Sequence, residues 1–474
     1  MTLRIFNLRP GFCIRLWLGT LSSIPAVDLA ADTDNYYVQN RSYRTVPSGD
    51  IPRYVRPLSK TGLEGVESVD WLDIGLDHRI RYEYRDQDFR RTPQQGLDEA
   101  VLLRTRAYLG IRRGLDPFRF AAEFQDSRSY NSAYVSDNRD VNELDLIQLY
   151  GELYFDDALG TNRPLSIKGG RFWLESLDRR LIANNEFRNT TNNFQGVRVN
   201  LGQQSNDWEL DLLALQPIER LKYRFDRPVE QEWLYGIITH WRRWSDIVTL
   251  QPYYLGYRHD SKTVRDAANA LNLHNTGLRG YGMVGASGFD YDANVVHQFG
   301  RSNGRQPTSA WACAVELGYT FEHTASHPRI STFYGYGSGD TNPGDGTHQT
   351  FNPLFGFNQP WSRNDYFSWD NLHAPKLRLE LEPLKDLKME TGYNAYWLAS
   401  DRAAWKRASL QDKTGQSGSF LGHEFDIRFR YKWTPRIESD VSYAWFTPGE
   451  MPGHLGKIRD SHFLYLQLTL SAFN

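Results

Sequence analysis

The chain has 474 residues, of which 40% are hydrophobic, 14% aromatic and 24% charged, and its formal net charge is −2. This composition excludes a disordered chain, which would contain fewer aromatic residues, and the lack of a basic excess argues against nucleic acid as a partner. Two cysteines are too few for a disulfide scaffold or a four-ligand zinc site. Many aromatic residues combined with a mean hydropathy of −0.60 are typical of alternating strands whose two faces meet lipid and water.

The first 31 residues have the pattern of a secretory signal peptide. Three arginines precede a short apolar run at residues 16–21, and small residues follow as far as Ala31. A positively charged region, a short apolar region and small residues are the three parts of such a signal. We therefore expect a signal peptide at 1–31 and secretion through the inner membrane. Residues 32–68 are polar and contain prolines, and we interpret them as an irregular periplasmic N-terminal segment.

From Trp71 onward the sequence alternates with a period of two. In the first segment Ile80 and Tyr82 share the apolar parity, whereas Arg79 and Arg81 share the charged parity. The alternation recurs to the C-terminus in roughly 18 segments of about ten residues, which is the length of a tilted membrane-spanning strand. One face of each strand is therefore expected to meet lipid, and the other face a water-filled lumen.

The connectors between these segments alternate between long and short. A long connector at 85–98 precedes a tight turn at 114–117, and a very long connector at 338–373 precedes a turn at 383–385. Outer-membrane barrels have short periplasmic turns and longer extracellular loops. The fold class that we predict for residues 69–474 is therefore all-β, a transmembrane antiparallel β-barrel of about 18 strands with both termini in the periplasm.

The alternation is weakest around residues 248–258, where Pro252 lies inside a predicted strand. Proline cannot donate to the ladder of hydrogen bonds between strands and is not expected in the middle of one. A barrel of sixteen strands is therefore the alternative.

Two stretches of the chain have a distinctive sequence. One runs from Gly169-Gly170-Arg171 to Phe194-Gln195-Gly196-Val197-Arg198, and the other from Tyr334 through Asp340-Thr341-Asn342-Pro343-Gly344-Asp345-Gly346 and Phe351-Asn352-Pro353-Leu354-Phe355 to Trp397. Together they resemble the alginate-export family of bacterial outer-membrane porins, and the resemblance extends from about residue 70 to the end of the chain. It implies a monomeric 18-stranded barrel, without a cofactor, whose lumen passes an anionic polyuronate.

Arginines on the lumen-facing parity are the main candidates for binding a substrate. Guanidinium groups make bidentate contacts to carboxylates and so offset the loss of hydration when an anionic polymer enters a pore. With two arginines from the connector at 173–194, the predicted set is Arg79, Arg81, Arg104, Arg106, Arg119, Arg171, Arg179, Arg180, Arg198, Arg428 and Arg430. Carboxylates such as Glu123 and Asp211 share the same parity, so the alternative is that many of these arginines pair with them and brace the wall.

Two connectors contain clusters of polar side chains that suggest a specific structure. The connector at 173–194 contains arginines and asparagines, and we expect it to fold inward and narrow the pore; a solvated external loop is the alternative. Asp340, Asn342 and Asp345 are weak candidates for a calcium site, because hard oxygen ligands at alternate positions can wrap Ca²⁺. A turn in which these residues set the backbone geometry is the stronger interpretation, and no metal is predicted.

The function that we expect is an outer-membrane porin that conducts an anionic polysaccharide, such as alginate or its oligomers, by passive diffusion. The expected partners are this polysaccharide, outer-membrane lipid, the barrel assembly machinery, and periplasmic and inner-membrane export components. One alternative is a general porin or an uptake porin for sugars or small anions. Another is a barrel whose loops serve as an adhesin or enzyme, but the 12 histidines are scattered and no Ser/His/Asp spacing suggests catalysis.

Overall fold

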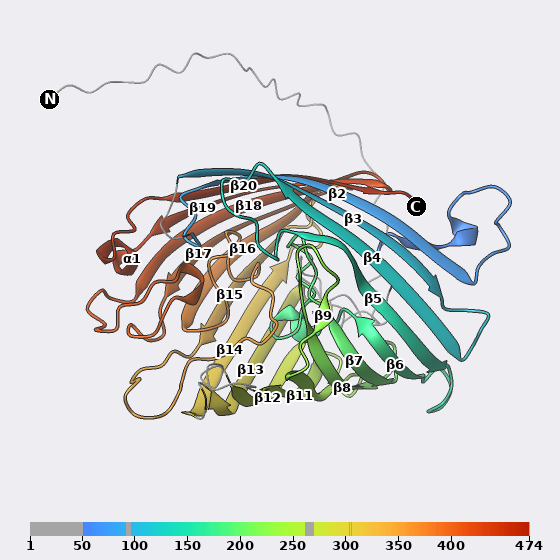
Figure 1. Ribbon diagram of the computed structural model, residues 1–474, viewed down its shortest axis with the longest axis horizontal. Coiled ribbons are helices and arrows are strands. Elements are labelled where there is room, and N and C mark those ends of the chain that lie inside the picture. Colours follow the sequence, from blue (N-terminus) through green and yellow to red (C-terminus); the bar gives the residue numbers. More distant parts are fainter. Residues whose placement is uncertain (1–50, 92–95, 261–269, 303, 305, 474) are drawn as a thin grey trace, which may run out of the picture. The chain divides into compact units, whose positions relative to one another are not determined.

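Figure 1 shows a computed structural model of the chain in which long antiparallel strands follow one another around a barrel. The structure describes residues 51–91, 96–260, 270–302, 304 and 306–473. The predicted signal peptide and the first part of the predicted N-terminal segment, residues 32–50, lie outside the described residues.

Eighteen strands within the described residues form the barrel wall, and each is antiparallel to both of its neighbours. β20 pairs with β2, with Leu468 opposite Ile80, and this pairing closes the barrel. The predicted fold class is therefore confirmed, with 18 strands and not sixteen. The wall strands are β2 (Leu72–Asp86), β3 (Leu97–Ile111), β4 (Phe118–Tyr130), β5 (Asn142–Phe155), β6 (Leu165–Phe172), β7 (Phe194–Leu201), β8 (Trp208–Glu219), β10 (Glu232–Trp241), β11 (Thr249–His259), β12 (Leu271–Met283), β13 (Phe289–Ser302), β14 (Gln306–Thr320), β15 (Arg329–Gly337), β16 (Leu372–Leu384), β17 (Leu387–Trp397), β18 (Phe420–Thr434), β19 (Ile437–Pro448) and β20 (Ser461–Ser471).

The remaining elements are short. β1 (Val55–Pro57) pairs with the first residues of β2, and β9 (Arg227–Pro228) pairs with the end of β8. Three single turns of 3₁₀ helix, η2 (Leu58–Lys60), η3 (Leu177–Arg179) and η5 (Lys406–Ala408), and one short helix, α1 (Glu450–His454), lie in the connectors. Among the described residues, no helix is long and apolar enough to cross a membrane.

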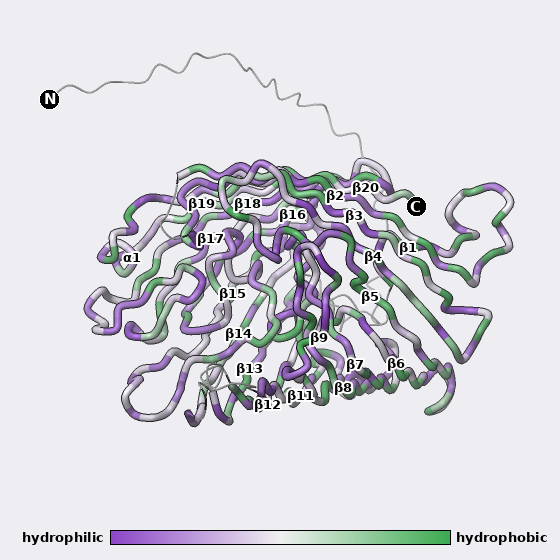
Figure 2. The backbone as a smooth tube through the Cα atoms, in the orientation of Figure 1, coloured by the Kyte–Doolittle hydropathy of each residue, from purple (hydrophilic) through white to green (hydrophobic). Residues whose placement is uncertain are grey.

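The two faces of each strand differ in the way that the alternating sequence predicts. On β2 the side chain of Ile80 is 39% exposed, whereas Arg79 and Arg81 are each 2% exposed. The same contrast continues around the wall, where Val295 and Leu377 are exposed on the outer face. Figure 2 shows the hydropathy alternating along the strands. The exposed apolar side chains form the outer belt that faces the hydrocarbon of a bilayer.

Pro252 lies inside β11, paired with Leu278 of β12. On the other side of β11 the ladder with β10 runs from Glu232 to Ile238 and resumes only at Trp241, so it is interrupted beside Pro252. The hydroxyl of Thr239 donates to the Pro252 carbonyl at 2.8 Å within this gap. The strand therefore tolerates proline because the missing N–H falls where the ladder is already broken.

The connectors separate into two rims, as expected. The short-turn rim contains connectors such as 112–117, 385–386 and 435–436, and the long-loop rim contains 87–96, 131–141, 338–371 and 398–419. In barrels of this class the short turns face the periplasm. The short-turn rim is therefore the periplasmic side.

Cys313 provides a test of the outer face. It lies on β14 between Trp311 and Val315, which are 49% and 39% exposed. In the assembled barrel in a bilayer, an uncharged membrane-soluble maleimide should label Cys313, and a sulfonated maleimide should not. A Cys313→Ser variant is the control for labelling elsewhere. Labelling by the charged reagent at the rate seen in the unfolded chain would contradict this placement.

Candidate functional site in the barrel lumen

The connector between β6 and β7, residues 173–193, lies inside the barrel, and we call it the inner loop. The guanidinium of Arg79, on the lumen face of β2, donates to the carbonyls of Glu186 and Arg188 at 3.0 and 2.8 Å. The side chain of Asn189 donates to the carbonyl of Leu103 on β3 at 3.0 Å. The inward position that the sequence suggested is therefore observed.

The inner loop turns with an unusual backbone. Leu177, Asp178 and Arg179 have φ values of 53°, 53° and 61°, so three consecutive residues with side chains occupy the left-handed region. Each such residue costs about 1–3 kcal/mol and persists only where its surroundings determine the conformation. The next residue, Arg180, supplies such a restraint by pairing with Asp292 of β13 at 2.6 Å. The turn directs Arg179 to the lumen cavity described below.

Glu186 of the inner loop neutralises part of the arginine row on β2 and β3. Its carboxylate pairs with Arg104, and with Arg106 at 2.9 Å. Burial opposes the charged form, but Arg104, Arg106 and Arg79 outweigh it and hold the pKa of Glu186 well below its usual range. The carboxylate therefore stays ionised at neutral pH, and these arginines are not free cations.

The longest connector, residues 338–371, also enters the barrel, and we call it the long loop. Ser362 donates to the carboxylate of Glu424 on β18 at 2.6 Å, and Arg363 pairs with Glu390 on β17. Trp361 and Trp369 are fully buried, with ring centroids 5.4 Å apart. The long loop therefore fills the lumen beside β14 to β19, and its two tryptophans form part of an internal core.

The glycine-rich turn of the long loop uses its polar side chains locally. Asp340 accepts from the N–H of Asn342 at 3.2 Å, Asn342 accepts from Gly344 at 3.4 Å, and Asp345 accepts from Thr347 at 2.8 Å. In the described part of the chain, no three His, Cys, Asp or Glu side chains are grouped as metal ligands would be. The contacts support the interpretation as a turn.

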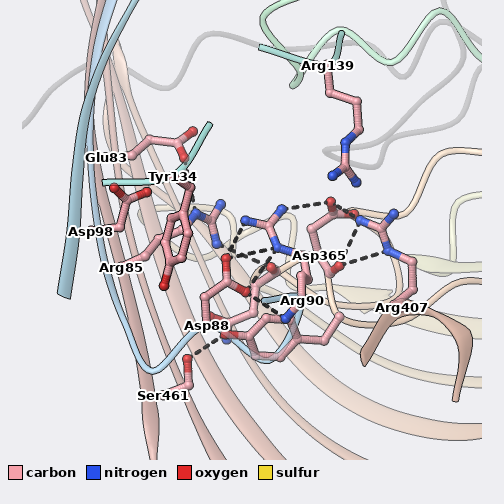
Figure 3. Close-up of polar contacts among 12 residues, drawn as sticks. Glu83, Arg85, Asp88, Arg90, Asp98, Tyr134, Arg139, Asp365, Arg407 and Ser461 are labelled. Atoms are coloured by element: carbon pink, nitrogen blue, oxygen red, sulfur yellow. Dashed lines mark hydrogen bonds and ion pairs between the residues drawn. The ribbon is translucent and has the colours of Figure 1, made fainter. Parts of the chain in front are cut away.

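Three long loops meet at an ionic cluster formed by Asp88, Arg90, Asp365 and Arg407, which we call the clasp. Figure 3 shows Arg90 between Asp88 and Asp365, with Arg407 on the far side of Asp365. Arg90 lies 2.8 Å from the Asp88 carboxylate and 3.2 Å from that of Asp365. Burial opposes ionisation of Asp365, but Arg407, Arg90 and Arg188 outweigh it and lower its pKa. The clasp is therefore fully charged at neutral pH and ties the loops together.

A cavity of about 700 Å³ lies between the inner loop, the long loop and the short-turn rim. Six of its lining side chains are acidic and eleven are basic, so its wall has a positive excess. The basic residues are Arg53, Arg56, Arg79, Arg104, Arg106, Arg179, Arg363, Arg428, Arg430, Lys432 and Arg436.

Six of the eleven predicted arginines reach this cavity, namely Arg79, Arg104, Arg106, Arg179, Arg428 and Arg430. The other five do not line it, and each pairs with a carboxylate. Arg81 pairs with Glu83, Arg119 with Asp116, Arg171 with Asp145, Arg180 with Asp292 and Arg198 with Asp211. For these five the contacts match the alternative interpretation, in which arginines brace the wall.

Among the described residues, several cations of the cavity form no ion pair: two lie on β18, and others include Arg53, Arg56 and Arg436. Arg428 pairs with Asp440 at 2.5 Å, but Arg430 and Lys432, the next lumen-parity residues toward the periplasm, form no ion pair within the described residues. Strand parity identified Arg430, and the same parity places Lys432 on the lumen face. It could not identify Arg363 or Arg436, because they lie in connectors, where parity has no meaning.

The N-terminal segment closes part of the cavity at the short-turn rim. Val55 pairs with Gly75 of β2, and the hydroxyl of Tyr54 donates to Glu123 at 2.5 Å. A Cβ on Gly75 would lie 2.7 Å from the Tyr54 ring, so glycine is needed for this close approach. Residues 51–57 thus bring Arg53 and Arg56 to the periplasmic end of the lumen.

Residues 70–464 match the family profile described as alginate export. The chain belongs to the alginate export family. No curated protein matches the chain. Among solved structures, OpdQ of Pseudomonas aeruginosa is 14% identical with a TM-score of 0.56, and the match covers 84% of this chain and 97% of that one. OccD3 (OpdP) of the same organism is 12% identical with a TM-score of 0.54, covering 90% and 96%.

OccAB1 of Acinetobacter baumannii is 12% identical with a TM-score of 0.54, and the match covers 87% of this chain and 98% of that one. At such low identity these three structures show a shared fold alone. Family, fold and apolar belt together make this member of the alginate export family an outer-membrane β-barrel of the porin type.

Glu186→Gln tests the electrostatic role of the inner loop. Removing one negative charge about 5 Å from the path of an ion changes its energy by about 0.8 kcal/mol in water, so anion selectivity should rise about fourfold. The reversal potential in a KCl gradient measures this change. Because its pKa is lowered, Glu186 stays ionised between pH 8 and pH 5. The reversal potential of the wild type should therefore be the same at both pH values. Glu322→Gln, in an exposed short turn, is the control and should have no effect.

Asp365→Asn tests the clasp. Removing the carboxylate leaves Arg407 without its ion pair and Arg90 with Asp88 alone, at a site where Asp365 is only 12% exposed, which should cost about 3 kcal/mol. Hydrogen exchange at residues 351–371 should then accelerate, while Asp401→Asn, in an exposed loop, should leave it unchanged. A lowered carboxyl pKa stabilises the fold above the unfolded-state pKa, so wild-type exchange protection should be lost only as the pH falls below about 4. Unchanged exchange in Asp365→Asn would rule out the clasp as a restraint.

Proposed function

We propose that this barrel conducts an anionic polysaccharide, an alginate-like polyuronate or its oligomers, across the outer membrane by passive diffusion. The observation that carries the proposal is the row of cations along β18 and the following turn, Arg428, Arg430, Lys432 and Arg436, at the periplasmic end of the cavity. A polyuronate has one carboxylate on each sugar. A row of cations spaced by two residues, about 6.8 Å along a strand, offers such a chain successive partners.

The roles of the arginines differ along the lumen. Arg430 and Lys432 have no carboxylate partner in the described part of the chain, so they are available to contact an anion that has passed Arg436 at the short-turn rim. Arg179 reaches the cavity from the inner loop. Arg104 and Arg106 share Glu186, so they hold the loop in place and contribute less net charge. Cations without a carboxylate partner attract the anion more strongly than paired ones. An anion can therefore enter the lumen and is not held so tightly that it cannot leave.

A second candidate is an uptake or general porin for small anions or sugars. The inner loop and the long loop confine the cavity to about 700 Å³, a volume within the range of small-ligand sites, about 300–1,000 Å³. A polymer needs a continuous path, which requires one of these loops to move. Current that polyuronate does not block would favour this candidate.

The remaining parts of the proposal concern biogenesis and assembly. Residues 1–31 act as a signal peptide, residues 32–68 as a periplasmic segment and residues 69–474 as the barrel, which the barrel assembly machinery inserts as a monomer. The polymer is delivered by periplasmic and inner-membrane export components. The N-terminal segment is suited to the periplasmic side because residues 51–57 lie at the short-turn rim.

The decisive experiment is single-channel recording with polyuronate added on the periplasmic side. The wild-type barrel should conduct anions preferentially and be blocked by the polymer. The double variant Arg430→Glu/Lys432→Glu should lose the block and reduce the anion-to-cation permeability ratio roughly tenfold, because two charges are reversed beside the path.

The control is Arg402→Glu/Lys413→Glu, which makes the same change of charge in the exposed connector between β17 and β18. It should keep both the selectivity and the block. If the lumen variant also kept both, the cations of β18 would not be the site that recognises the polymer.

A further inference from the structure

Four tyrosine–histidine pairs with the same geometry lie on the outer face of the barrel. In each pair the tyrosine hydroxyl and Nδ1 of the histidine form a hydrogen bond between neighbouring strands. The pairs are Tyr254–His274, Tyr334–His373, Tyr393–His423 and Tyr443–His462, with distances of 2.6, 2.6, 2.7 and 2.8 Å. Repetition on four pairs of strands indicates a common role for this arrangement and not a single local contact.

The histidines mark one level of the barrel, next to the long-loop rim. Each lies within the first four residues of β12, β16, β18 or β20, and these strands begin at the long-loop rim. Their parity is that of exposed apolar residues further along the same strands, such as Leu278, Leu377 and Leu466. The pairs therefore lie on the outer face, where the apolar belt ends and the extracellular side begins.

The hydrogen bond determines which atom each histidine presents. With the phenol O–H as the donor, Nδ1 is the acceptor, and the proton of the neutral ring is on Nε2. In the described part of the chain, Nε2 of His274 has no hydrogen-bond partner. A donor is therefore available at the level of the lipid headgroups, where acceptors are abundant.

The register across β11, β12 and β13 adds cations at this level. His274 is opposite Phe299, and His297 is opposite Thr276 one row below. One row above, Asn272 lies between Arg258 and Arg301, both on the outer face. We call Arg258, His274, His297 and Arg301 the rim patch.

The apolar belt begins directly below the rim patch. The next row toward the periplasm contains Leu278 and Val295, which are 44% and 45% exposed. Rows are two residues, or about 6.8 Å, apart along a strand. The step from arginine and histidine rows to an apolar row matches the step from phosphate to hydrocarbon in a lipid leaflet.

We propose that the rim patch binds the phosphate groups of lipids in the outer leaflet. Arg258 and Arg301 supply charge-assisted hydrogen bonds, His274 and His297 supply ring N–H donors, and Leu278 and Val295 contact the acyl chains. Arg258 also pairs with Asp260 at 2.8 Å, but both side chains are more than half exposed, so this pair is weak and a phosphate can replace the carboxylate. The lipid anchors the barrel at a fixed depth, independently of the solute that passes through it.

The test is native mass spectrometry of the detergent-solubilised barrel with two added lipids, lipid A that carries its phosphates and the same lipid after dephosphorylation. The rim variant is Arg258→Gln/His274→Phe/His297→Phe/Arg301→Gln, which keeps the bulk of each side chain. It should bind phosphorylated lipid A about thirtyfold more weakly than the wild type, and it should bind the dephosphorylated lipid equally well.

A control variant makes the same four kinds of change outside the rim patch, Arg113→Gln/His78→Phe/His323→Phe/Arg402→Gln, and should bind like the wild type. Equal affinity of the wild type for the two lipids, or equal loss in the rim and control variants, would overturn the proposal. Competition by inorganic phosphate at the same concentration as lipid would indicate a site for the free anion. Loss of binding in EDTA would indicate a bridging metal ion. Either result would also overturn direct binding of lipid phosphate.

A single substitution tests the proposal if the variant with four substitutions does not fold. Tyr254→Phe removes the hydroxyl that orients His274 and leaves every charge of the rim patch in place. Its affinity for phosphorylated lipid A should fall about threefold, consistent with the loss of one modest hydrogen bond. An unchanged affinity would show that the Tyr254–His274 pair does not orient a lipid ligand.

Discussion

Closure of the backbone hydrogen-bond network is the constraint on which the rest of this structure depends. Hydrocarbon offers no partner to an N–H or C=O group, so the sheet must return to its first strand, as β20 does to β2. A closed wall gives every strand one outer face and one inner face, and the sequence must therefore keep a period of two through eighteen strands. Even Pro252 obeys this constraint, because it occupies a gap in the ladder between β10 and β11.

Closure also concentrates arginines inside a narrow lumen, where each must be paired or hydrated. Two arrangements meet this need. Wall carboxylates pair with some arginines, as Asp211 does with Arg198 at 2.7 Å. The inner loop brings carbonyl groups and Glu186 to the row on β2 and β3. Within the described residues, positive charge therefore remains unpaired near the short-turn rim, at Arg430, Lys432 and Arg436. The position of unpaired charge, and not the number of arginines, determines where an anion is attracted.

The fold was predictable because strand period and connector length are local properties of the sequence. The site was predictable only in part. Parity placed Arg198 and Arg430 on the same face, but it could not show that Arg198 is paired and Arg430 is not, because pairing depends on register between strands. Site residues in loops could not be predicted for a second reason. Arg363 lies in the long loop, where no periodicity applies, and its partner Glu390 is 27 residues away. Trp361 is buried because that loop folds into the barrel.

The outer rim and the lumen are linked through the register of β17 and β18. His423 faces outward and bonds to Tyr393, while its neighbour Glu424 faces inward and holds Ser362 of the long loop. A slip of one residue would exchange these two faces, placing a carboxylate against lipid and releasing the long loop. The Tyr393–His423 pair outside and the Glu424–Ser362 contact inside therefore restrain the same strand from opposite sides. A substitution that breaks the register on either face should disturb both the Tyr393–His423 pair and the position of the long loop.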